Sequence, residues 1–398
     1  MVSLRVYMRS FFVMVIAIAT FSITILIIGS QQTKTRDVVK YEETPTKSLP
    51  VQDLLSLTEK YGDFTDNSDA DLTPTENDIT ESSLSSKRRL SLLIFGADRS
   101  GTTFISRMFS EDPNIFMIYE PLWITKRWRK DQPNEDWSRS ELEVVNGILS
   151  CNFDDFPFAK KFLAHTSKNW AAAPFKNPFQ TKNFCNFSET GKRLCPDFSS
   201  HPDFASEACA KRYKHSVTKV AQVRSPYKSI STLIPQVFEE NPETHIKVIQ
   251  ILRDPRGSLN SRIQLGWMPK HTSPAFIPSA RYACTKTAEN VKYGRNLPKK
   301  YQERYMEVYY RDIAMFPIKT ALKIYSFAGF DMPDELLKWI VVNTSPSEEA
   351  LAAEAKKRFS SVRNSTANVE KWRSAPTQQN RIIEEECSEL MKLIGIKK

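Results

Sequence analysis

The chain has 398 residues, which allows one large domain or two ordinary ones, and its hydrophobic content of 40% excludes wholesale disorder. Lys and Arg number 56 against 46 Asp and Glu, but this excess is unevenly distributed. Residues 31–88 hold 7 Lys/Arg against 12 Asp/Glu, whereas residues 89–398 hold 47 against 34, a net charge of +13. The folded part is therefore expected to bind an anionic ligand, which includes polyanions, phosphate-bearing cofactors and nucleic acids.

An uncharged and almost wholly apolar segment covers residues 11–29. At about 1.5 Å per residue, a helix of this length spans about 28 Å, close to the thickness of a hydrocarbon core. The apolar stretch of a cleaved signal peptide is usually shorter, about 7–15 residues, and no small-residue cleavage site follows this one. We therefore predict a transmembrane signal anchor over residues 11–29, preceded by a cytosolic tail over residues 1–10.

The features that follow this segment favour a secretory lumen for the rest of the chain. Three glycosylation acceptor patterns begin at Asn186, Asn343 and Asn364, of which the first and last are the stronger candidates. All the cysteines also follow the apolar segment, without the paired spacing of a zinc site: Cys151, Cys185, Cys195, Cys209, Cys284 and Cys387. We predict a single-pass type II protein, with local disulfides among the first four cysteines.

Between the anchor and the folded part lies a polar linker. Residues 61–86 are dominated by Asp, Thr, Ser, Asn and Glu, with no sustained period of a helix or a strand. We predict a disordered lumenal stem over residues 30–88 and one folded domain over residues 89–398.

The first motif joins a strand to a helix through a glycine loop. Residues 90–95 are a short apolar run typical of a buried parallel strand, and residues 104–109 have the apolar spacing of a helix. The loop between them, GADRSGTT, directs backbone N–H groups and a helix N-terminus at an anion. Its glycines are spaced as in nucleoside triphosphatases, but Thr102 replaces the lysine and Arg99 lies inside the loop. A phosphosulfate or diphosphate-like ligand is favoured; the alternative is an ordinary turn with incidental glycines.

An acidic residue follows the next predicted strand. Residues 115–119 form a second apolar run, and Glu120 stands directly after it. In an open α/β sheet, ligands bind at the carboxyl ends of the strands. From the residues alone, Glu120 is equally a general base, a helix-capping group or the partner of a nearby arginine.

The second motif, RDPRGSLNSR at residues 253–262, follows a predicted strand over residues 246–252. Asp254 and Pro255 are typical of a helix N-cap and the first helical residue. The motif is therefore expected to open a helix at the end of the strand.

This second motif has the groups for a second phosphate. Arg253 at the strand end and Ser261 on the following helix can bind one by charge-assisted hydrogen bonds. A structural Arg–Asp pair at the helix start is the alternative, and a magnesium site at Asp254 is disfavoured by the adjacent Arg256. Two anion sites suit a nucleotide that carries separate 5′ and 3′ phosphate groups.

Together the two motifs resemble the sulfotransferase superfamily, which uses 3′-phosphoadenosine 5′-phosphosulfate (PAPS). They are most similar to the Golgi carbohydrate 6-O-sulfotransferases, which act on galactose, N-acetylglucosamine or N-acetylgalactosamine. RSGTTF at residues 99–104 corresponds to the family's RSGSSF, and YEPLW at residues 119–123 to its Y-E-P-x-W. RDPRGSLNSR at residues 253–262 corresponds to R-D-P-R-A-x-x-x-S-R, and the resemblance covers roughly residues 90–395.

Weaker similarities and two departures accompany these motifs. YYRD at residues 309–312 and KWR at residues 371–373 are further matches. Thr102 and Thr103 replace the commoner Ser-Ser, which preserves the hydroxyl groups, and Gly257 replaces the commoner Ala, which is expected to loosen the helix start slightly.

The resemblance implies a site and a mechanism. Glu120 would be the general base, and Arg99 would stabilise the charge on the leaving oxygen. The residues implied to bind PAPS are Arg99, Ser100, Gly101, Thr102, Thr103 and Phe104 in the first motif, and Arg253, Asp254, Pro255, Arg256 and Ser261 in the second. No metal is implied.

The implied fold is a three-layer α/β domain with a P-loop-like, mostly parallel sheet and helices on both faces. The implied partners are a glycan or glycosaminoglycan acceptor, such as keratan or chondroitin, and the Golgi membrane, with a possible homodimer and no nucleic acid. The alternative functions are a P-loop kinase-like phosphotransferase, a catalytically inactive glycan-binding relative, and a sulfotransferase for tyrosine or heparan.

Overall fold

The computed structural model describes residues 89–131, 137–168, 203–354 and 360–397, and between them residues 179, 181–182, 184, 186–187 and 193–194. The predicted anchor over residues 11–29 and stem over residues 30–88 lie outside the described residues, as do Cys185 and Cys195. In the part of the chain that is described, no helix is long and apolar enough to cross a membrane.

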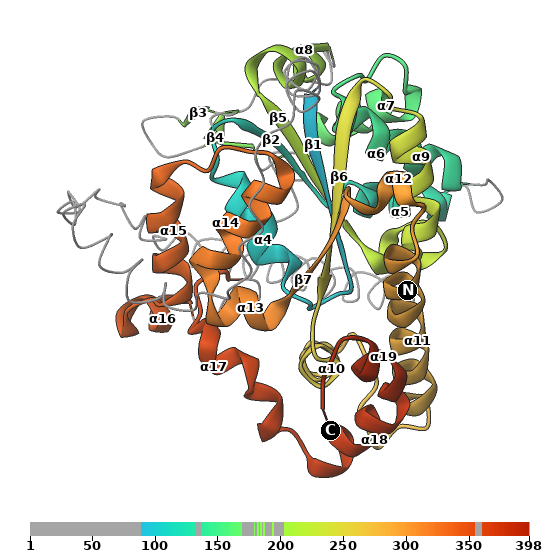
Figure 1. The fold of residues 1–398 in the computed structure, drawn as a ribbon, viewed down its shortest axis with the longest axis vertical. Helices are drawn as coiled ribbons and strands as arrows, with labels where there is room; N and C mark the ends of the chain where they lie inside the picture. The colour runs from blue at the N-terminus through green and yellow to red at the C-terminus, as the bar shows by residue number, and fades with distance from the viewer. Residues whose placement is uncertain are drawn as a thin grey trace, which may run out of the picture. The chain divides into compact units, whose positions relative to one another are not determined.

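The centre of the domain is a five-stranded sheet in which all neighbouring strands are parallel. Its strands are β1 (Arg89–Gly96), β2 (Ile115–Tyr119), β5 (His215–Ala221), β6 (Thr244–Leu252) and β7 (Tyr305–Tyr309), in the spatial order β2-β5-β1-β6-β7 (Figure 1). The short strands β3 (Asn186–Phe187) and β4 (Arg193–Leu194) form a separate antiparallel pair. The predicted α/β class with a parallel sheet is confirmed.

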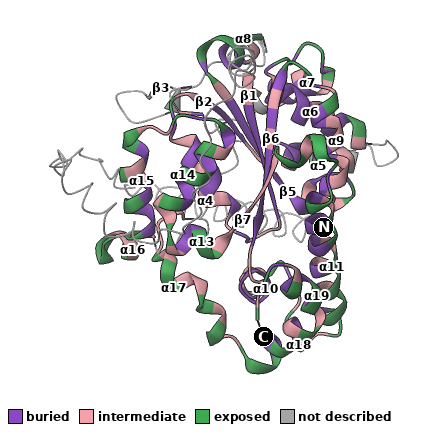
Figure 2. Ribbon diagram, viewed as in Figure 1, coloured by how far each residue is buried: buried purple, intermediate pink, exposed green. Residues whose placement is uncertain are grey.

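Helices cover both faces of the sheet, as predicted. Alternate side chains of β1 belong to two separate cores: Leu93 and Phe95 to one, Leu92 and Ile94 to the other. The first core is completed by α5 (Leu122–Asp131), α6 (Trp137–Ser150), α7 (Pro157–Lys168) and α9 (Ile234–Glu239). The second is completed by α4 (Thr102–Ser110), α14 (Pro317–Ala328) and α15 (Asp334–Thr344). Figure 2 shows the strands buried between these two helix layers.

A third cluster lies below the carboxyl ends of the strands in Figure 1. It contains α10 (Pro255–Gln264), α11 (Phe276–Arg295), α18 (Thr377–Glu386) and α19 (Ser388–Leu393). The disulfide Cys284–Cys387 fastens the C-terminal helices to α11. The disulfide Cys151–Cys209 closes a separation of 58 residues and is one of the local pairings that we expected.

The remaining elements are short. They are α8 (Asp203–Glu207), η2 (Ala208–Arg212), η3 (Gln222–Arg224), η4 (Pro226–Lys228), η5 (Ile230–Thr232), α12 (Lys299–Gln302), α13 (Tyr310–Met315), α16 (Glu348–Glu354), α17 (Ser365–Val369) and η6 (Lys371–Ser374). Two of the predicted glycosylation sites fall on described side chains. Asn364 is exposed at the start of α17, whereas Asn343 is buried and its amide contacts Trp339 and Ser361.

The predicted strands correspond to β1, β2 and β6, but the sequence analysis missed β5. This strand lies between β2 and β1, and the sequence HSVTKVA interrupts the apolar run expected of a central strand with Thr218 and Lys219. Both side chains are buried and have partners, since Thr218 donates to the Ile118 carbonyl at 3.0 Å and Lys219 pairs with Glu120. A polar strand is tolerated in the centre because its polar groups are satisfied.

Candidate functional site

The two motifs meet at the carboxyl edge of the sheet. The strand β1 lies between β5 and β6, so the loops that follow β1 and β6 are neighbours where ligands bind in open α/β sheets. Arg253 Nη1 donates to the Arg99 carbonyl at 2.9 Å, across a separation of 154 residues. Arg99 Nε donates to Ser261 Oγ at 2.9 Å. The two motifs therefore lie side by side and contact each other.

The first loop depends on glycine at its last position. Gly101 has φ +105 and precedes the first turn of α4, and a Cβ there would come within 2.6 Å of the Tyr310 ring. Arg99 also has a left-handed backbone, with φ 65. The loop turns sharply between these two residues, so that the N-terminus of α4 follows it directly.

The hydroxyl groups of this loop differ in their surroundings. Ser100 is 1% exposed, and its Oγ has no hydrogen-bond partner among the described residues. It lines a narrower cavity behind the loop, together with Pro255. Thr103 Oγ1 lies 3.1 Å from the hydroxyl of Tyr119, which connects the loop to the end of β2. A buried hydroxyl without a partner is a group that a ligand oxygen can satisfy.

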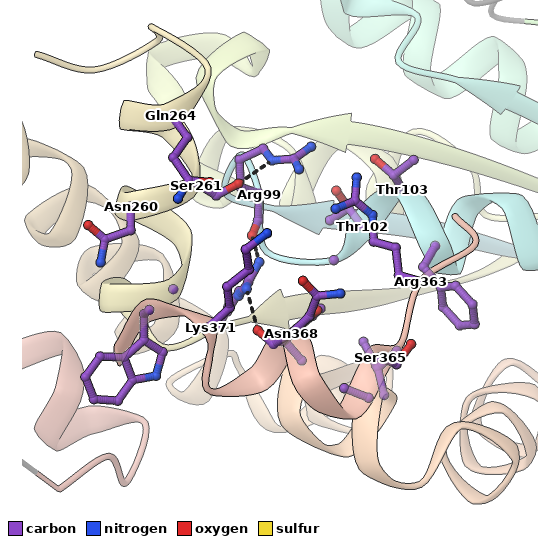
Figure 3. A pocket seen from close by; sticks show the side chains of 18 of the residues that line it. Arg99, Thr102, Thr103, Asn260, Ser261, Gln264, Arg363, Ser365, Asn368 and Lys371 are labelled. Carbon is purple, nitrogen blue, oxygen red and sulfur yellow. Dashed lines mark hydrogen bonds between the residues drawn. The ribbon is translucent and has the colours of Figure 1, made fainter. Parts of the chain in front are cut away.

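A cavity of about 290 Å³ opens where the motifs meet (Figure 3). Four parts of the chain line it: the first loop and α4, the helix α10, the helix α13, and a C-terminal segment over residues 360–375. Its polar lining comprises Arg99, Thr102, Thr103, Arg253, Asn260, Ser261, Gln264, Tyr310, Ser360, Ser361, Arg363, Ser365, Asn368 and Lys371. Phe104 and Trp372 also line it.

Three arginines make the electrostatic potential of this cavity positive. Burial lowers the pKa of Arg99, and the charges of Arg363 and Arg253 lower it further. Burial likewise lowers the pKa of Arg253, although Tyr310 and Asp254 act in the opposite direction. Guanidinium groups stay protonated in proteins, so the charges of these three arginines repel one another. The cavity therefore favours a ligand with several negative charges.

The side chain of Arg253 is tightly enclosed. It lies over the Tyr310 ring at 4.0 Å and donates to the carbonyl oxygens of Arg99 and Asn368, at 2.9 and 3.4 Å. A Cβ at Gly257 would come within 2.9 Å of Arg253 Nε and 3.2 Å of its Nη2. We expected Gly257 only to loosen the helix start slightly. The structure gives it a further role, because the absence of a Cβ at this position makes room for the Arg253 guanidinium.

The other charged residues of the second motif do not line this cavity. Asp254 caps α10 by accepting a hydrogen bond from the Arg256 backbone N–H at 2.8 Å, and it also pairs with the Arg256 guanidinium. Arg256 contacts Glu384 at 2.7 Å and lies over the Trp372 ring at 3.8 Å. The structural Arg–Asp pair is therefore Asp254–Arg256, and Arg256 holds Trp372 in the cavity wall.

Glu120 is an ion-pair partner. It stands at the end of β2 with φ 47, and its carboxylate pairs with Lys219 from β5 and with Arg224 from η3. The Lys219 side chain is 3% exposed and that of Glu120 14%, so both are shielded from water. The sequence left Glu120 as a general base, a helix-capping group or the partner of an arginine. The structure shows it paired with an arginine and also with a lysine.

The neighbouring Tyr119 connects this ion-pair cluster to the first loop. Burial raises the pKa of Tyr119, but Lys219, the hydrogen bond with Thr103 and the charge of Arg224 together lower it below its usual value. Tyr119 therefore lies in a positive potential at the side of the loop next to β5.

The sequence analysis missed most of the C-terminal wall of the cavity. Arg363 lies near Arg99, Ser361 Oγ accepts a hydrogen bond from Arg107 at 3.1 Å, and the Asn368 carbonyl accepts one from Arg253. The segment over residues 360–368, SSVRNSTAN, is polar and resembles any surface loop. The sequence signal that we had for this wall was the KWR match at residues 371–373.

Comparison with known proteins agrees with this geometry. The model of the sulfotransferase domain matches residues 90–395. The chain belongs to the sulfotransferase family. Carbohydrate sulfotransferase 3 of Mus musculus is 27% identical over 337 residues, which cover 78% of this chain and 68% of that protein. Carbohydrate sulfotransferase 1 of Danio rerio is 25% identical, over 72% of this chain and 73% of that protein. The predicted resemblance to the carbohydrate sulfotransferases is confirmed.

Among solved structures, the sulfotransferase domain from the Synechococcus PCC 7002 olefin synthase is similar to this sulfotransferase with a TM-score of 0.43 and 16% identity. The match covers 78% of this chain and 97% of that one.

Proposed function

We propose that this sulfotransferase transfers the sulfuryl group of PAPS to the 6-hydroxyl of a galactose, N-acetylglucosamine or N-acetylgalactosamine in a glycan or glycosaminoglycan chain. The observation that carries the proposal is the convergence of Arg99, Arg253 and Arg363 on one cavity beside a glycine loop and a helix N-terminus. The carbohydrate sulfotransferases to which the chain is similar support the class of acceptor.

The described residues fit the donor. The first loop offers backbone N–H groups, the hydroxyl groups of Thr102 and Thr103 and the guanidinium of Arg99 to a 5′-phosphosulfate. Arg253 and Ser261 supply a second cationic and hydroxyl pair for a 3′-phosphate. Trp372 lines the same cavity, where its side chain can contact a purine base.

In this proposal the donor supplies an electrophilic sulfur and a phosphate leaving group. Lys219 and Arg224 orient the Glu120 carboxylate, which accepts the proton of the acceptor hydroxyl in this proposal. Arg99 stabilises the negative charge on the leaving oxygen, because its guanidinium lies at the loop and is already fixed by Ser261.

We also propose a Golgi location, with residues 11–29 as a type II membrane anchor. The disulfides Cys151–Cys209 and Cys284–Cys387 support an oxidising lumen for the domain, because disulfides persist there and are rare in the cytosol.

The test is transfer of labelled sulfate from PAPS by the full chain in detergent. The acceptors are keratan, desulfated keratan, chondroitin and N-acetylglucosamine-terminated oligosaccharides, with the product position determined by mass spectrometry and with ATP as a control donor. We expect a 6-O-sulfated product from at least one acceptor. The absence of PAPS binding would overturn the assignment of the cavity, and a product sulfated elsewhere would overturn the 6-O position alone.

A further inference from the structure

Exposed aromatic side chains occur in the segment that follows Arg224, the residue that pairs with Glu120. The segment after β5 exposes 70% of Tyr227 and 46% of Val223, and the adjoining helix α11 exposes 48% of Tyr282. We call Val223, Tyr227, Lys228 and Tyr282 the aromatic surface. Large side chains at this exposure contribute little to the core, so they indicate a binding role when they gather in one place.

Lys228 joins the two halves of this surface. Its Nζ donates to the Tyr282 hydroxyl at 3.0 Å and lies 4.7 Å from the centre of the ring. In the described part of the chain, the contacts of Lys228 include no carboxylate. Its positive charge is therefore left for an external anion, beside the Tyr282 ring.

The surface is held rigidly by a buried asparagine. Asn290 of α11 is 1% exposed; its Oδ1 accepts from the Ile230 backbone N–H at 2.8 Å, and its Nδ2 donates to the Lys228 carbonyl at 3.2 Å. Thr287 of the same helix donates to Gln222 at 3.3 Å. The segment after β5 is thus fastened to α11 on both sides of the aromatic surface.

These contacts maintain an unfavourable backbone. Tyr227 has φ 52 and Lys228 has φ 55, two consecutive left-handed residues that carry a Cβ. Such conformations persist where the surroundings fix them, and they gather at binding and catalytic sites. Because Tyr227 is 70% exposed, this backbone does not serve core packing. It presents the side chain to solvent.

The aromatic surface begins close, along the chain, to the proposed reaction site. Arg224, which pairs with Glu120, precedes Tyr227 by three residues. Three residues span at most about 11 Å, so the Cα of Tyr227 lies within that distance of the Cα of Arg224. A chain whose reacting sugar lies at Glu120 therefore reaches the aromatic surface with its neighbouring sugars.

We propose that the aromatic surface binds the acceptor chain beyond the reacting sugar, and that the acceptor is an anionic glycan. The apolar C–H face of a pyranose ring packs on Tyr227 and Tyr282, and Lys228 pairs with a carboxylate or sulfate group of the chain. This inference rests on the proposed function, since it assigns the acceptor of the same site.

The experiment compares a long and a short acceptor with the full chain in detergent. The long acceptor is an anionic glycosaminoglycan hexasaccharide, and the short one is the methyl glycoside of its reacting sugar. For Tyr227→Ala and Tyr282→Ala we expect the KM of the hexasaccharide to rise at least tenfold. The kcat, and the KM of the methyl glycoside, should stay within twofold of the unmodified protein, because only the remote contacts are removed.

Three further variants separate stacking from charge and from structural damage. Tyr227→Phe keeps the ring and should keep the KM of the unmodified protein. Lys228→Gln should raise the KM of the hexasaccharide alone and reduce its dependence on salt. Phe204→Ala is the matched control, because Phe204 is 43% exposed on α8, far from α10 and α11 (Figure 1). Unchanged binding of adenosine 3′,5′-bisphosphate verifies that each variant is folded.

The outcomes distinguish this inference from the proposed function. If Tyr227→Ala and Tyr282→Ala leave the KM of the hexasaccharide unchanged, the aromatic surface does not bind the acceptor. If they change the sedimentation of the protein instead of the KM, the surface is an interface between copies, and the inference is overturned. If the unmodified protein transfers sulfate to no acceptor, the proposed function fails. In that case, calorimetry with the hexasaccharide tests the aromatic surface separately. Binding by the unmodified protein that is lost in Tyr227→Ala supports the inference. Equal binding by both proteins, or no binding by the unmodified protein, overturns it.

Discussion

Replacement of Gly257 by alanine tests whether Arg253 anchors the donor cavity. The new Cβ would lie 2.9 Å from Arg253 Nε, closer than nonbonded atoms approach, so one of the two groups must move. The guanidinium has little freedom, because the Tyr310 ring lies at 4.0 Å and the Arg99 carbonyl accepts its Nη1 hydrogen bond at 2.9 Å. The new Cβ therefore displaces the Arg253 guanidinium and weakens its hydrogen bond to the Arg99 carbonyl, which joins the two motifs.

Gly257→Ala should change both the free energy of unfolding and the affinity for adenosine 3′,5′-bisphosphate. Overpacking costs about 1–3 kcal/mol. Alanine in a helix is about 1 kcal/mol more favourable than glycine, so the net free energy of unfolding should fall by about 0–2 kcal/mol. A hydrogen bond to a charged group contributes about 1.5–3 kcal/mol. Loss of the Arg253 contact to the 3′-phosphate should therefore weaken binding of adenosine 3′,5′-bisphosphate by about 10- to 100-fold.

The assay is a double-mutant cycle of Gly257→Ala and Arg253→Ala, with the Kd measured by calorimetry and the free energy of unfolding by urea denaturation. When Arg253 is already alanine, the clash is gone. Gly257→Ala should then leave the Kd unchanged and stabilise the protein by about 1 kcal/mol. Ser258→Ala, one residue further along α10, is the control and should change the Kd by less than twofold. The same loss of affinity in both backgrounds would refute the reasoning.

The remaining predictions concern the base, the C-terminal disulfide and acid stability. Glu120→Gln should lower kcat by about 10²–10⁴ while the Kd for adenosine 3′,5′-bisphosphate changes less than threefold; retained turnover would remove Glu120 from the mechanism. Cys387→Ser, compared with its parent by urea unfolding, should lose about 2–4 kcal/mol, because the disulfide closes a separation of 103 residues. Burial and the charge of Arg89 lower the pKa of His215 from 6.5 to about 4. The unfolded chain therefore takes up a proton below pH 6.5 that the folded chain accepts only near pH 4. Stability should therefore fall between pH 6.5 and 4 by up to about 3 kcal/mol, and His215→Gln should flatten this dependence in urea unfolding; an equal slope in both proteins would contradict it.

The local motifs were predictable because their chemistry is local. A short apolar run, a glycine loop and a helical repeat over residues 90–109 specify a strand, a phosphate loop and a helix without reference to the rest of the chain. The same holds for the helix that Asp254 and Pro255 begin. The parallel sheet followed from several such runs separated by helices.

The interactions between distant segments were not predictable in the same way. From the sequence alone, Lys219 is expected to be exposed to solvent. Its buried place in β5 depends on Glu120, 99 residues earlier, because the Glu120 carboxylate pairs with the Lys219 ammonium. The pairing of Cys284 with Cys387 was one of many permitted by six cysteines. These pairs exist only where the folded chain places the partners within a few ångströms.

The sequence by itself determined that this protein has an α/β domain with two motifs typical of anion binding, since each motif consists of neighbouring residues whose backbone geometry is set by local preference. Only the tertiary structure decided that Arg99, Arg253 and Arg363 share one cavity, that Glu120 is held by two cations, and that Tyr227 is exposed. Burial, charge repulsion and hydrogen bonding depend on distances in space, and the order of the strands in the sheet sets those distances.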